Sequence, residues 1–151
     1  MRFGLPLLAA ALALSSPSPA QTATYQVIGS GCPGTLGVPG NIPLTMPRLG
    51  TVMTVMLTNL PVNAALIGLG WARYMPPLDL TPFGMPCFLH VNITNTVFLF
   101  GQGGVALFNL AIPSDLGLLG VTFYTQAGVF DAMANLAGMT TSDAARAVIG
   151  F

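Results

Sequence analysis

Few side chains in this 151-residue chain could carry out chemistry. The chain has four Lys or Arg, four Asp or Glu and one His. Neither lysine nor glutamate occurs, which excludes a lysine Schiff base, a P-loop and a glutamate acid/base pair. The arginines are too few and too scattered to neutralise the phosphates of a nucleic acid, so we expect no nucleic-acid partner. The charged residues are Arg2, Arg48, Arg73, Arg146, Asp79, Asp115, Asp131 and Asp143.

The aspartates and the histidine show no catalytic spacing. The aspartates lie far apart, in turns and at strand ends, where a carboxylate usually accepts hydrogen bonds from nearby backbone amides. A calcium site built from two such loops stays open as an alternative, although no D-x-D-x-D-G run is present. His90 lies on the polar face of its predicted strand, and no nucleophile elbow accompanies Ser114 or Ser142. We therefore predict no enzymatic activity, no cofactor and no metal site.

One group of side chains has the composition of a ligand site. Trp71 and Tyr74 are aromatic rings of the kind that stack on sugars, and Asp79 lies in a proline-rich loop that follows them. These three residues are the candidates for a small-ligand or carbohydrate site. The alternative, which the hydrophobic register favours, is that Trp71 continues the apolar series of Ile67 and Leu69 and belongs to the core.

The N-terminal residues have the pattern of an export signal. Arg2 precedes an apolar run at residues 5–14, and small residues precede a cleavage site before Gln21. A transmembrane anchor is the alternative, but about ten apolar residues span only about 15 Å as a helix, half of a hydrocarbon core of about 30 Å. We therefore expect residues 1–20 to be a cleaved signal peptide. Residues 21–151 are then one domain without a membrane span, extracellular or on the cell surface.

Export gives the two cysteines a structural meaning. Cys32 and Cys87 are the only pair, and in an oxidising compartment such a pair is expected to form a disulfide. A metal site or a reactive thiol is the alternative, but no CxxC occurs and only His90 lies near Cys87. Closing a loop of about 55 residues would stabilise the fold by about 4 kcal/mol in the chain-entropy model.

Short segments with period-two hydrophobicity dominate the rest of the chain. At residues 87–94, for example, every odd position is apolar. The 18 glycines and 13 prolines separate such segments into strands with the spacing typical of a sandwich. We predict an all-β antiparallel β-sandwich of about eight strands, with a helical turn only at residues 131–136. The expected strands are 25–28, 51–58, 64–71, 87–94, 96–100, 105–112, 121–131 and 144–149.

An ordered series of short motifs runs through residues 21–151. In this order the motifs resemble an uncharacterised domain that recurs in exported proteins of planctomycete-type bacteria. The resemblance implies a secreted β-sandwich with its two cysteines paired, and it implies no catalytic residues. The motifs are Gly31-Cys32-Pro33-Gly34, Pro47-Arg48-Leu49-Gly50, Ile67-Gly68-Leu69-Gly70, Pro77-Leu78-Asp79-Leu80, Gly84-Met85-Pro86-Cys87, Ala111-Ile112-Pro113, Leu119-Gly120-Val121-Thr122-Phe123-Tyr124-Thr125-Gln126, Thr140-Thr141-Ser142 and Ile149-Gly150.

The composition favours association between copies. Residues 21–151 hold three arginines and four aspartates, hence a net charge of −1, so copies repel one another weakly. Natural sheets protect their edge strands with lysine and other charges, and this chain has no lysine. The sequence therefore predicts a structural or interaction module that binds itself or other cell-surface proteins through strand edges. Ala23, Tyr25 and Val27, which alternate with polar residues after the cleavage site, mark the candidate strand for assembly.

Two other functions stay open. The first is the small-ligand or carbohydrate site at Trp71, Tyr74 and Asp79. The second is an outer-membrane β-barrel, because the chain ends in Phe151 after an alternating segment. The predicted strands are, however, mostly shorter than the roughly 9–11 residues that a membrane-spanning strand needs.

Overall fold

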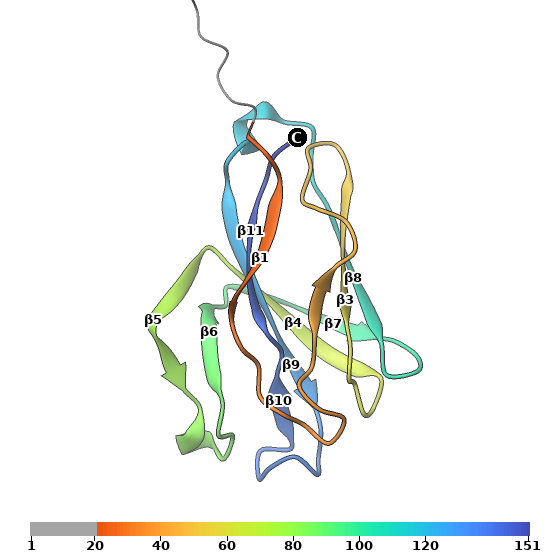
Figure 1. Ribbon diagram of the computed structural model, residues 1–151, viewed down its shortest axis with the longest axis vertical. Helices are drawn as coiled ribbons and strands as arrows, with labels where there is room; N and C mark the ends of the chain where they lie inside the picture. Colours follow the sequence, from red (N-terminus) through yellow and green to blue (C-terminus); the bar gives the residue numbers. More distant parts are fainter. Residues whose placement is uncertain (1–20) are drawn as a thin grey trace, which may run out of the picture.

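The computed structural model describes residues 21–151, in which two antiparallel β-sheets pack face to face (Figure 1). The expected signal peptide, residues 1–20, lies outside the described residues. The larger sheet has the order β1-β11-β9-β4-β7, with β10 paired to β9, and the smaller sheet has the order β2-β3-β8. Strands β5 and β6 form a separate hairpin. The strands are β1 (Thr24–Gly29), β2 (Asn41–Pro43), β3 (Val52–Leu57), β4 (Ala64–Gly70), β5 (Ala72–Asp79), β6 (Phe88–Asn92), β7 (Asn95–Phe100), β8 (Ala106–Ala111), β9 (Thr122–Phe130), β10 (Met139–Thr141) and β11 (Ala144–Val148).

The hydrophobic core lies between the two sheets. Met53, Val55 and Leu57 alternate along β3 with more exposed residues, as a strand with one buried face must. They belong to one buried cluster with Ile67 of β4 and Val129 of β9. The prediction of an all-β antiparallel sandwich is confirmed.

The structure has more strands than the sequence predicted. β2 and β10 have three residues each, which is too short for a recognisable period-two pattern. β5 contains Pro76 and Pro77, which a strand with a single hydrogen-bonded neighbour tolerates. The predicted helical turn at residues 131–136 is wrong, because these residues form non-helical turns; the short helices are the 3₁₀ helices η1 (Thr81–Phe83) and η2 (Leu116–Leu118). Within residues 21–151, no helix has the length and hydropathy needed to cross a lipid bilayer.

The hairpin β5-β6 adds a third layer on the outer face of the larger sheet. Gly70 permits this close packing, because a Cβ there would collide with the backbone carbonyl of Asn92. Gln126 projects from the same outer face and is buried beneath the hairpin. Its Oε1 accepts a hydrogen bond from the His90 amide at 2.8 Å, and its Nε2 donates to the carbonyl oxygen of Phe88 at 3.0 Å. The Gln126 side chain thus provides β6 with the hydrogen bonds that a neighbouring strand would otherwise supply.

A buried polar network joins the two sheets on the side of β1 and β2. The Tyr25 hydroxyl donates to Asn41 Oδ1 at 2.7 Å and also lies within hydrogen-bond distance of Thr125 Oγ1. Asn41 Nδ2 donates to Thr125 Oγ1 at 3.1 Å and to the carbonyl oxygen of Asp143 at 3.0 Å. Burial raises the pKa of Tyr25 to about 12, against the opposing effect of its two hydrogen bonds.

Candidate functional site

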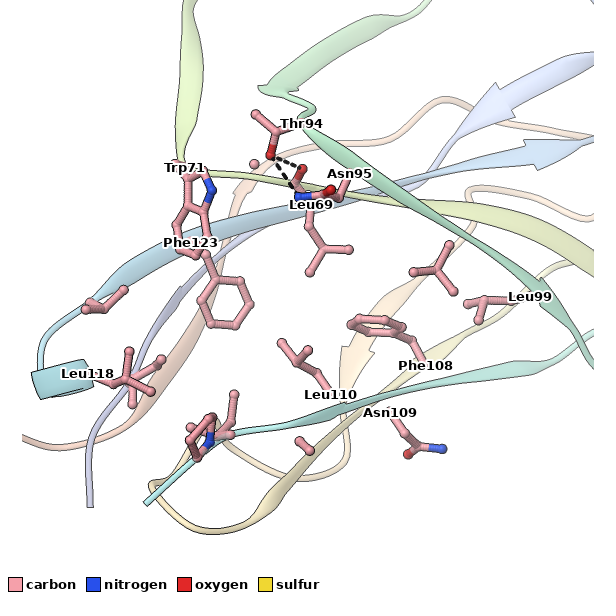
Figure 2. A pocket seen from close by; sticks show the side chains of 17 residues that line it. Leu69, Trp71, Thr94, Asn95, Leu99, Phe108, Asn109, Leu110, Leu118 and Phe123 are labelled. Carbon is pink, nitrogen blue, oxygen red and sulfur yellow. Dashed lines mark hydrogen bonds between the residues drawn. The ribbon is translucent and has the colours of Figure 1, made fainter. Parts of the chain in front are cut away.

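An apolar groove lies between the edge strands of the two sheets. β7 is the last strand of the larger sheet, and β8 is the last strand of the smaller one. A tight turn joins them, in which the Gln102 amide donates to the carbonyl oxygen of Val105 at 2.9 Å. The strands separate beyond this turn, and the sandwich opens between them (Figure 2). The groove has a volume of about 630 Å³.

The lining of the groove is part of the hydrophobic core. Leu99 of β7, Phe108 of β8 and Phe123 of β9 line it, and all three belong to the buried cluster between the sheets (Figure 2). The other large apolar lining residues are Leu69, Val97, Leu110, Ile112, Leu118, Val121 and Ile149. A partner that enters the groove therefore contacts the core directly.

The rim of the groove supplies a few neutral polar groups. Thr94 Oγ1 is 3.3 Å from the carbonyl oxygen of Leu69, and Asn95 Nδ2 is 3.4 Å from Thr94 Oγ1 (Figure 2). Asn109 Oδ1 accepts a hydrogen bond from Thr54 Oγ1 at 2.8 Å. Among the described residues that line the groove, none has an ionisable side chain. The site can bind apolar surface, but these side chains provide no general acid, general base or charged ligand for a metal.

The edge of β8 has backbone groups available for a further strand. The Ile112 amide donates to the carbonyl oxygen of Thr51 at 2.8 Å, so this residue faces the β3 side. Backbone direction alternates along an antiparallel strand, and β8 has no second neighbour in its sheet. The N–H and C=O groups that face away from β3 are therefore those of Leu107, Asn109 and Ala111.

The edge of β7 is available in the same way. The Gly101 amide donates to the carbonyl oxygen of Asn63 at 2.8 Å, which sets the phase of the pairing with β4. The outward-facing N–H and C=O groups are then those of Thr96, Phe98 and Phe100. β7 and β8 contain no charged residue and no proline, the side chains that natural proteins use to prevent edge pairing.

The structure separates the three residues predicted to bind a small ligand. Trp71 lies at the mouth of the groove, whereas Tyr74 lines a second pocket of about 360 Å³ together with Arg73 and His90. Asp79 ends β5 and accepts a hydrogen bond from the Thr81 amide at 2.8 Å. Trp71 and Tyr74 therefore line different pockets and do not form one stacking platform.

Trp71 is not a core residue. Its side chain is 65 % exposed, so the interpretation based on the register of Ile67 is wrong. β4 ends at Gly70, and the chain bends at Trp71 into β5, so the periodicity no longer describes which face is covered.

The predicted assembly strand is part of the larger sheet of its own chain. β1 pairs with β11, and Ala23 and Tyr25 are buried, whereas Val27 is exposed. Tyr25 also carries the network that joins the sheets. Donating this strand to another copy would therefore remove a buried residue from the core of its own chain.

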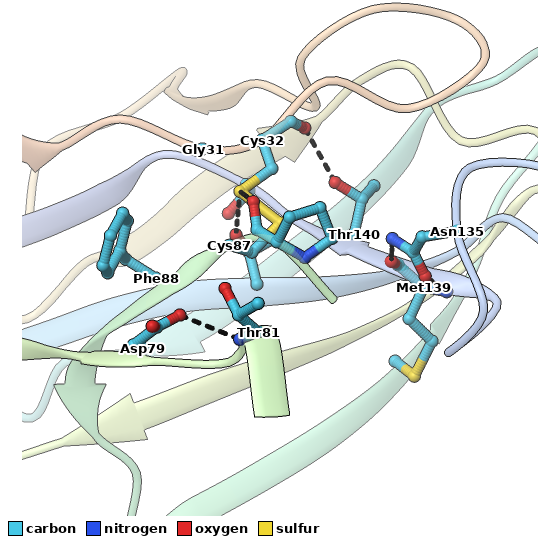
Figure 3. The surroundings of a disulfide bond; sticks show 12 residues. Gly31, Cys32, Asp79, Thr81, Cys87, Phe88, Asn135, Met139 and Thr140 are labelled. Carbon is cyan, nitrogen blue, oxygen red and sulfur yellow. Dashed lines mark hydrogen bonds between the residues drawn. A yellow bond between two sulfur atoms is a disulfide. The ribbon is translucent and has the colours of Figure 1, made fainter. Parts of the chain in front are cut away.

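The predicted disulfide is present. Cys32 and Cys87 are bonded to each other, with their Cα atoms 5.7 Å apart (Figure 3). The bond connects the segment after β1 to the residue before β6, so it attaches one end of the hairpin layer to the sandwich. The Cys32 amide also donates to the carbonyl oxygen of Thr141 at 3.0 Å.

All four aspartates accept hydrogen bonds from backbone amides, and for Asp79, Asp115 and Asp131 an amide two residues further along the chain is a donor, as predicted; Asp143 instead accepts from a distant segment. Besides Asp79, Asp115 accepts from Gly117, Asp131 from Thr35 and Met133, and Asp143 from Gly31. The hydroxyl and amide of Thr81 lower the pKa of Asp79. Desolvation raises the pKa of Asp131, but its hydrogen bonds outweigh this effect and hold the pKa below its ordinary value. In residues 21–151, no three His, Cys, Asp or Glu side chains gather as they would around a metal ion.

Sequence reasoning missed two buried polar residues, Gln126 and Asn41. Gln126 lies opposite the apolar register of Phe123 and Ala127, a pattern typical of an exposed polar face, but the hairpin covers that face. Asn41 lies in a three-residue strand between glycine- and proline-rich segments, which is too short to show a period-two pattern. A faint signal was Thr125, a polar residue within the inward register of Phe123 and Ala127.

No protein-family model, curated protein or solved structure matches the chain. Within residues 21–151, the groove is an apolar opening of the core that lies between two strands with unpaired outer edges, β7 and β8.

Proposed function

We propose that this protein is an exported, non-enzymatic interaction module that self-associates through the β7 and β8 edges. The observation that carries the proposal is the pair of unguarded edges on either side of an open part of the core. A second copy lays an edge strand along β7 or β8, satisfies the outward backbone groups and covers the groove with apolar side chains.

Electrostatics supports this mode of association. Among the described residues, no charged side chain lines the groove. Covering the groove therefore removes no charged group from water. The net charge of −1 on residues 21–151 gives little repulsion between copies. Removal of apolar surface from water then supplies most of the driving force.

The disulfide supports an extracellular or cell-surface location. Disulfides persist in oxidising compartments, and Cys32 and Cys87 are bonded here. The leader-like composition of residues 1–20 and the resemblance to an exported domain favour the same location.

An apolar small molecule is the second candidate partner. The volume of about 630 Å³ lies within the roughly 300–1,000 Å³ of ordinary ligand sites, and the rim offers a few neutral polar groups. A sugar is less well supported, because Trp71 and Tyr74 line different pockets.

The Val97→Lys variant tests the proposed association. Val97 lies on the β7 edge, lines the groove and is 40 % exposed, so a lysine there guards the edge without entering the closed core. The control is Val52→Lys, at a 50 % exposed position of β3, the central strand of the smaller sheet. Sedimentation of residues 21–151 should show a mass that rises with concentration for the wild type and for Val52→Lys, and a monomer for Val97→Lys.

Trp71 provides a second readout, because it is the only tryptophan and lies at the mouth of the groove. Its emission should shift to the blue as the wild type associates. A wild type that stays monomeric at high concentration, or a Val97→Lys variant that associates like the control, contradicts the proposal. A monomer whose Trp71 emission shifts on addition of a fatty acid favours the small-molecule alternative.

A further inference from the structure

Three loops at one end of the molecule carry protruding apolar side chains. They connect β1 to β2, β5 to β6 through η1, and β9 to β10, at the lower end of Figure 1. Four of their large apolar residues project into solvent. We call this group the apolar tip: Leu36 (55 % exposed), Phe83 (71 %), Met133 (84 %) and Leu136 (98 %).

The three loops of the apolar tip are fastened to one another. The Cys32–Cys87 disulfide joins the first loop to the second (Figure 3). The amide and the hydroxyl of Thr35 donate to Asp131 Oδ2 at 2.6 and 2.9 Å, which joins the first loop to the third. The Ala137 amide donates to the carbonyl oxygen of Gly84 at 3.4 Å, which joins the third to the second. The protruding side chains are thus held in place before any partner arrives, which lowers the entropic cost of binding.

The charges near the apolar tip are negative. Asp79 precedes η1 and Asp131 lies at the start of the third loop, and both carboxylates accept hydrogen bonds from backbone amides. The arginines of the described residues lie elsewhere: Arg48 in the loop between β2 and β3, Arg73 near the start of β5, and Arg146 in β11. The tip therefore has no cation to attract the anionic headgroups that basic segments bind.

We propose that the apolar tip docks the protein onto an uncharged lipid bilayer surface. Side chains that protrude from three separate loops need a matching pocket each on a protein, whereas a fluid bilayer receives them without prior shape complementarity. Burial of the four side chains in the interfacial region removes their apolar area from water. The carboxylates fit a neutral headgroup layer better than an anionic one. The groove between β7 and β8 takes no part in this contact.

Vesicle flotation tests the proposal with residues 21–151, which contain every element of the described fold. The probe is a vesicle of phosphatidylcholine alone. The tip variant is Phe83→Ser with Leu136→Ser, and the matched control is Leu116→Ser in η2, a 67 % exposed leucine outside the three loops. We expect the wild type and the control to float with the vesicles, and the tip variant to bind about tenfold less or weaker still. Unchanged thermal unfolding of the tip variant shows that the loss comes from the surface and not from the fold.

Two further arms separate the possible outcomes. Replacing part of the lipid by phosphatidylserine should leave binding unchanged or weaken it, and stronger binding would contradict the neutral-surface assignment. The Val97→Lys variant should float like the wild type, because its substitution lies in the groove. A wild type that does not float, or a tip variant that floats like the control, overturns the proposal whatever the state of self-association.

Discussion

Tyr25, Asn41 and Thr125 show how polar side chains of this protein are committed to the fold. Their hydrogen bonds lie inside the sandwich and connect β1 and β9 of the larger sheet to β2 of the smaller one. The four aspartates also have a structural role, because each accepts a hydrogen bond from a backbone amide in a loop or turn. Tyr25 and the four aspartates therefore stabilise the fold, and none of these five residues lines the groove.

The stability of the protein should fall at alkaline pH because of Tyr25. Burial raises its pKa from 10.0 to about 12, so the folded state retains a proton that the unfolded chain loses above pH 10. The stabilisation is complete below pH 10 and is lost as the pH rises through 12; two pKa units correspond to about 3 kcal/mol. Denaturant unfolding at a series of pH values measures this loss.

The control is Tyr25→Phe, which has no phenol to titrate. The substitution leaves Asn41 Oδ1 without its donor and should cost about 1–3 kcal/mol at neutral pH. The difference in unfolding free energy between wild type and variant should then narrow from pH 10 to pH 12. A constant difference over this range would contradict the assignment.

Removing the disulfide should lower the melting temperature strongly. The Cys32–Cys87 bond closes a loop of 55 residues, and its loss in a double Cys→Ser variant costs about 4 kcal/mol in the chain-entropy model. For a domain of this size that corresponds to a drop of about 10–15 °C, measured by calorimetry. Two free thiols in the intact mass of the native exported protein would contradict the pairing itself.

The hairpin β5-β6 is the element whose place depends most on side chains of another layer. Gly68 and Gly70 leave room for residues 92 and 93, and Gln126 satisfies backbone groups of β6. The disulfide holds the start of β6 at the other end of this contact. The hairpin is thus held against the larger sheet by close packing over the two glycines, by the Gln126 side chain and by the disulfide. It does not extend either sheet.

Gln126→Leu should detach β6 locally from the larger sheet. The leucine leaves the His90 amide and the carbonyl oxygens of Phe88 and Ser142 without partners, which should cost about 2–4 kcal/mol. Hydrogen exchange of the His90 amide should become much faster. The matched control is Gln26→Leu on β1, an exposed position where we expect a change within about 0.5 kcal/mol. Equal exchange rates at His90 in both variants would rule out this role for Gln126.

The two sides of the sandwich differ in whether the sheets are joined, and one end of the molecule differs from the other in its exposed apolar side chains. A hydrogen-bonded network connects the sheets on the side of β1 and β2, while β7 and β8 leave the opposite side open. One end bears the apolar tip, and its loops are fastened together. The two proposed contacts, one between copies and one at a bilayer, therefore use separate surfaces of the molecule.

Self-association should be nearly independent of ionic strength. Residues 21–151 hold seven charged side chains, three arginines and four aspartates, so salt has little charge to screen. The association constant from sedimentation should agree within about twofold between roughly 0.01 M and 1 M salt, where the Debye length falls from about 30 to about 3 Å. A tenfold change would indicate that unrecognised ion pairs drive the contact.

Local pattern alone determined the fold class and much of the core. Alternation at Met53, Val55 and Leu57 requires a half-buried strand, because side chains on a strand point to opposite faces with a period of two. The cysteine pair was predicted because only one pairing within the chain is available. Short strands such as β10 were not predicted, because three residues do not establish a period-two pattern.

Only the tertiary structure decided which surfaces have no partner. The sequence indicated that edges would be unguarded, but strand order makes β7 and β8 the edges beside the groove, and order depends on pairings between distant segments. The burial of Trp71 and Gln126 was also decided by the tertiary structure. One is apolar in pattern and lies exposed where β4 ends, and the other is polar in pattern and lies buried beneath the hairpin. Periodicity reports which residues share a face of a strand, whereas burial depends on what the rest of the chain lays over that face.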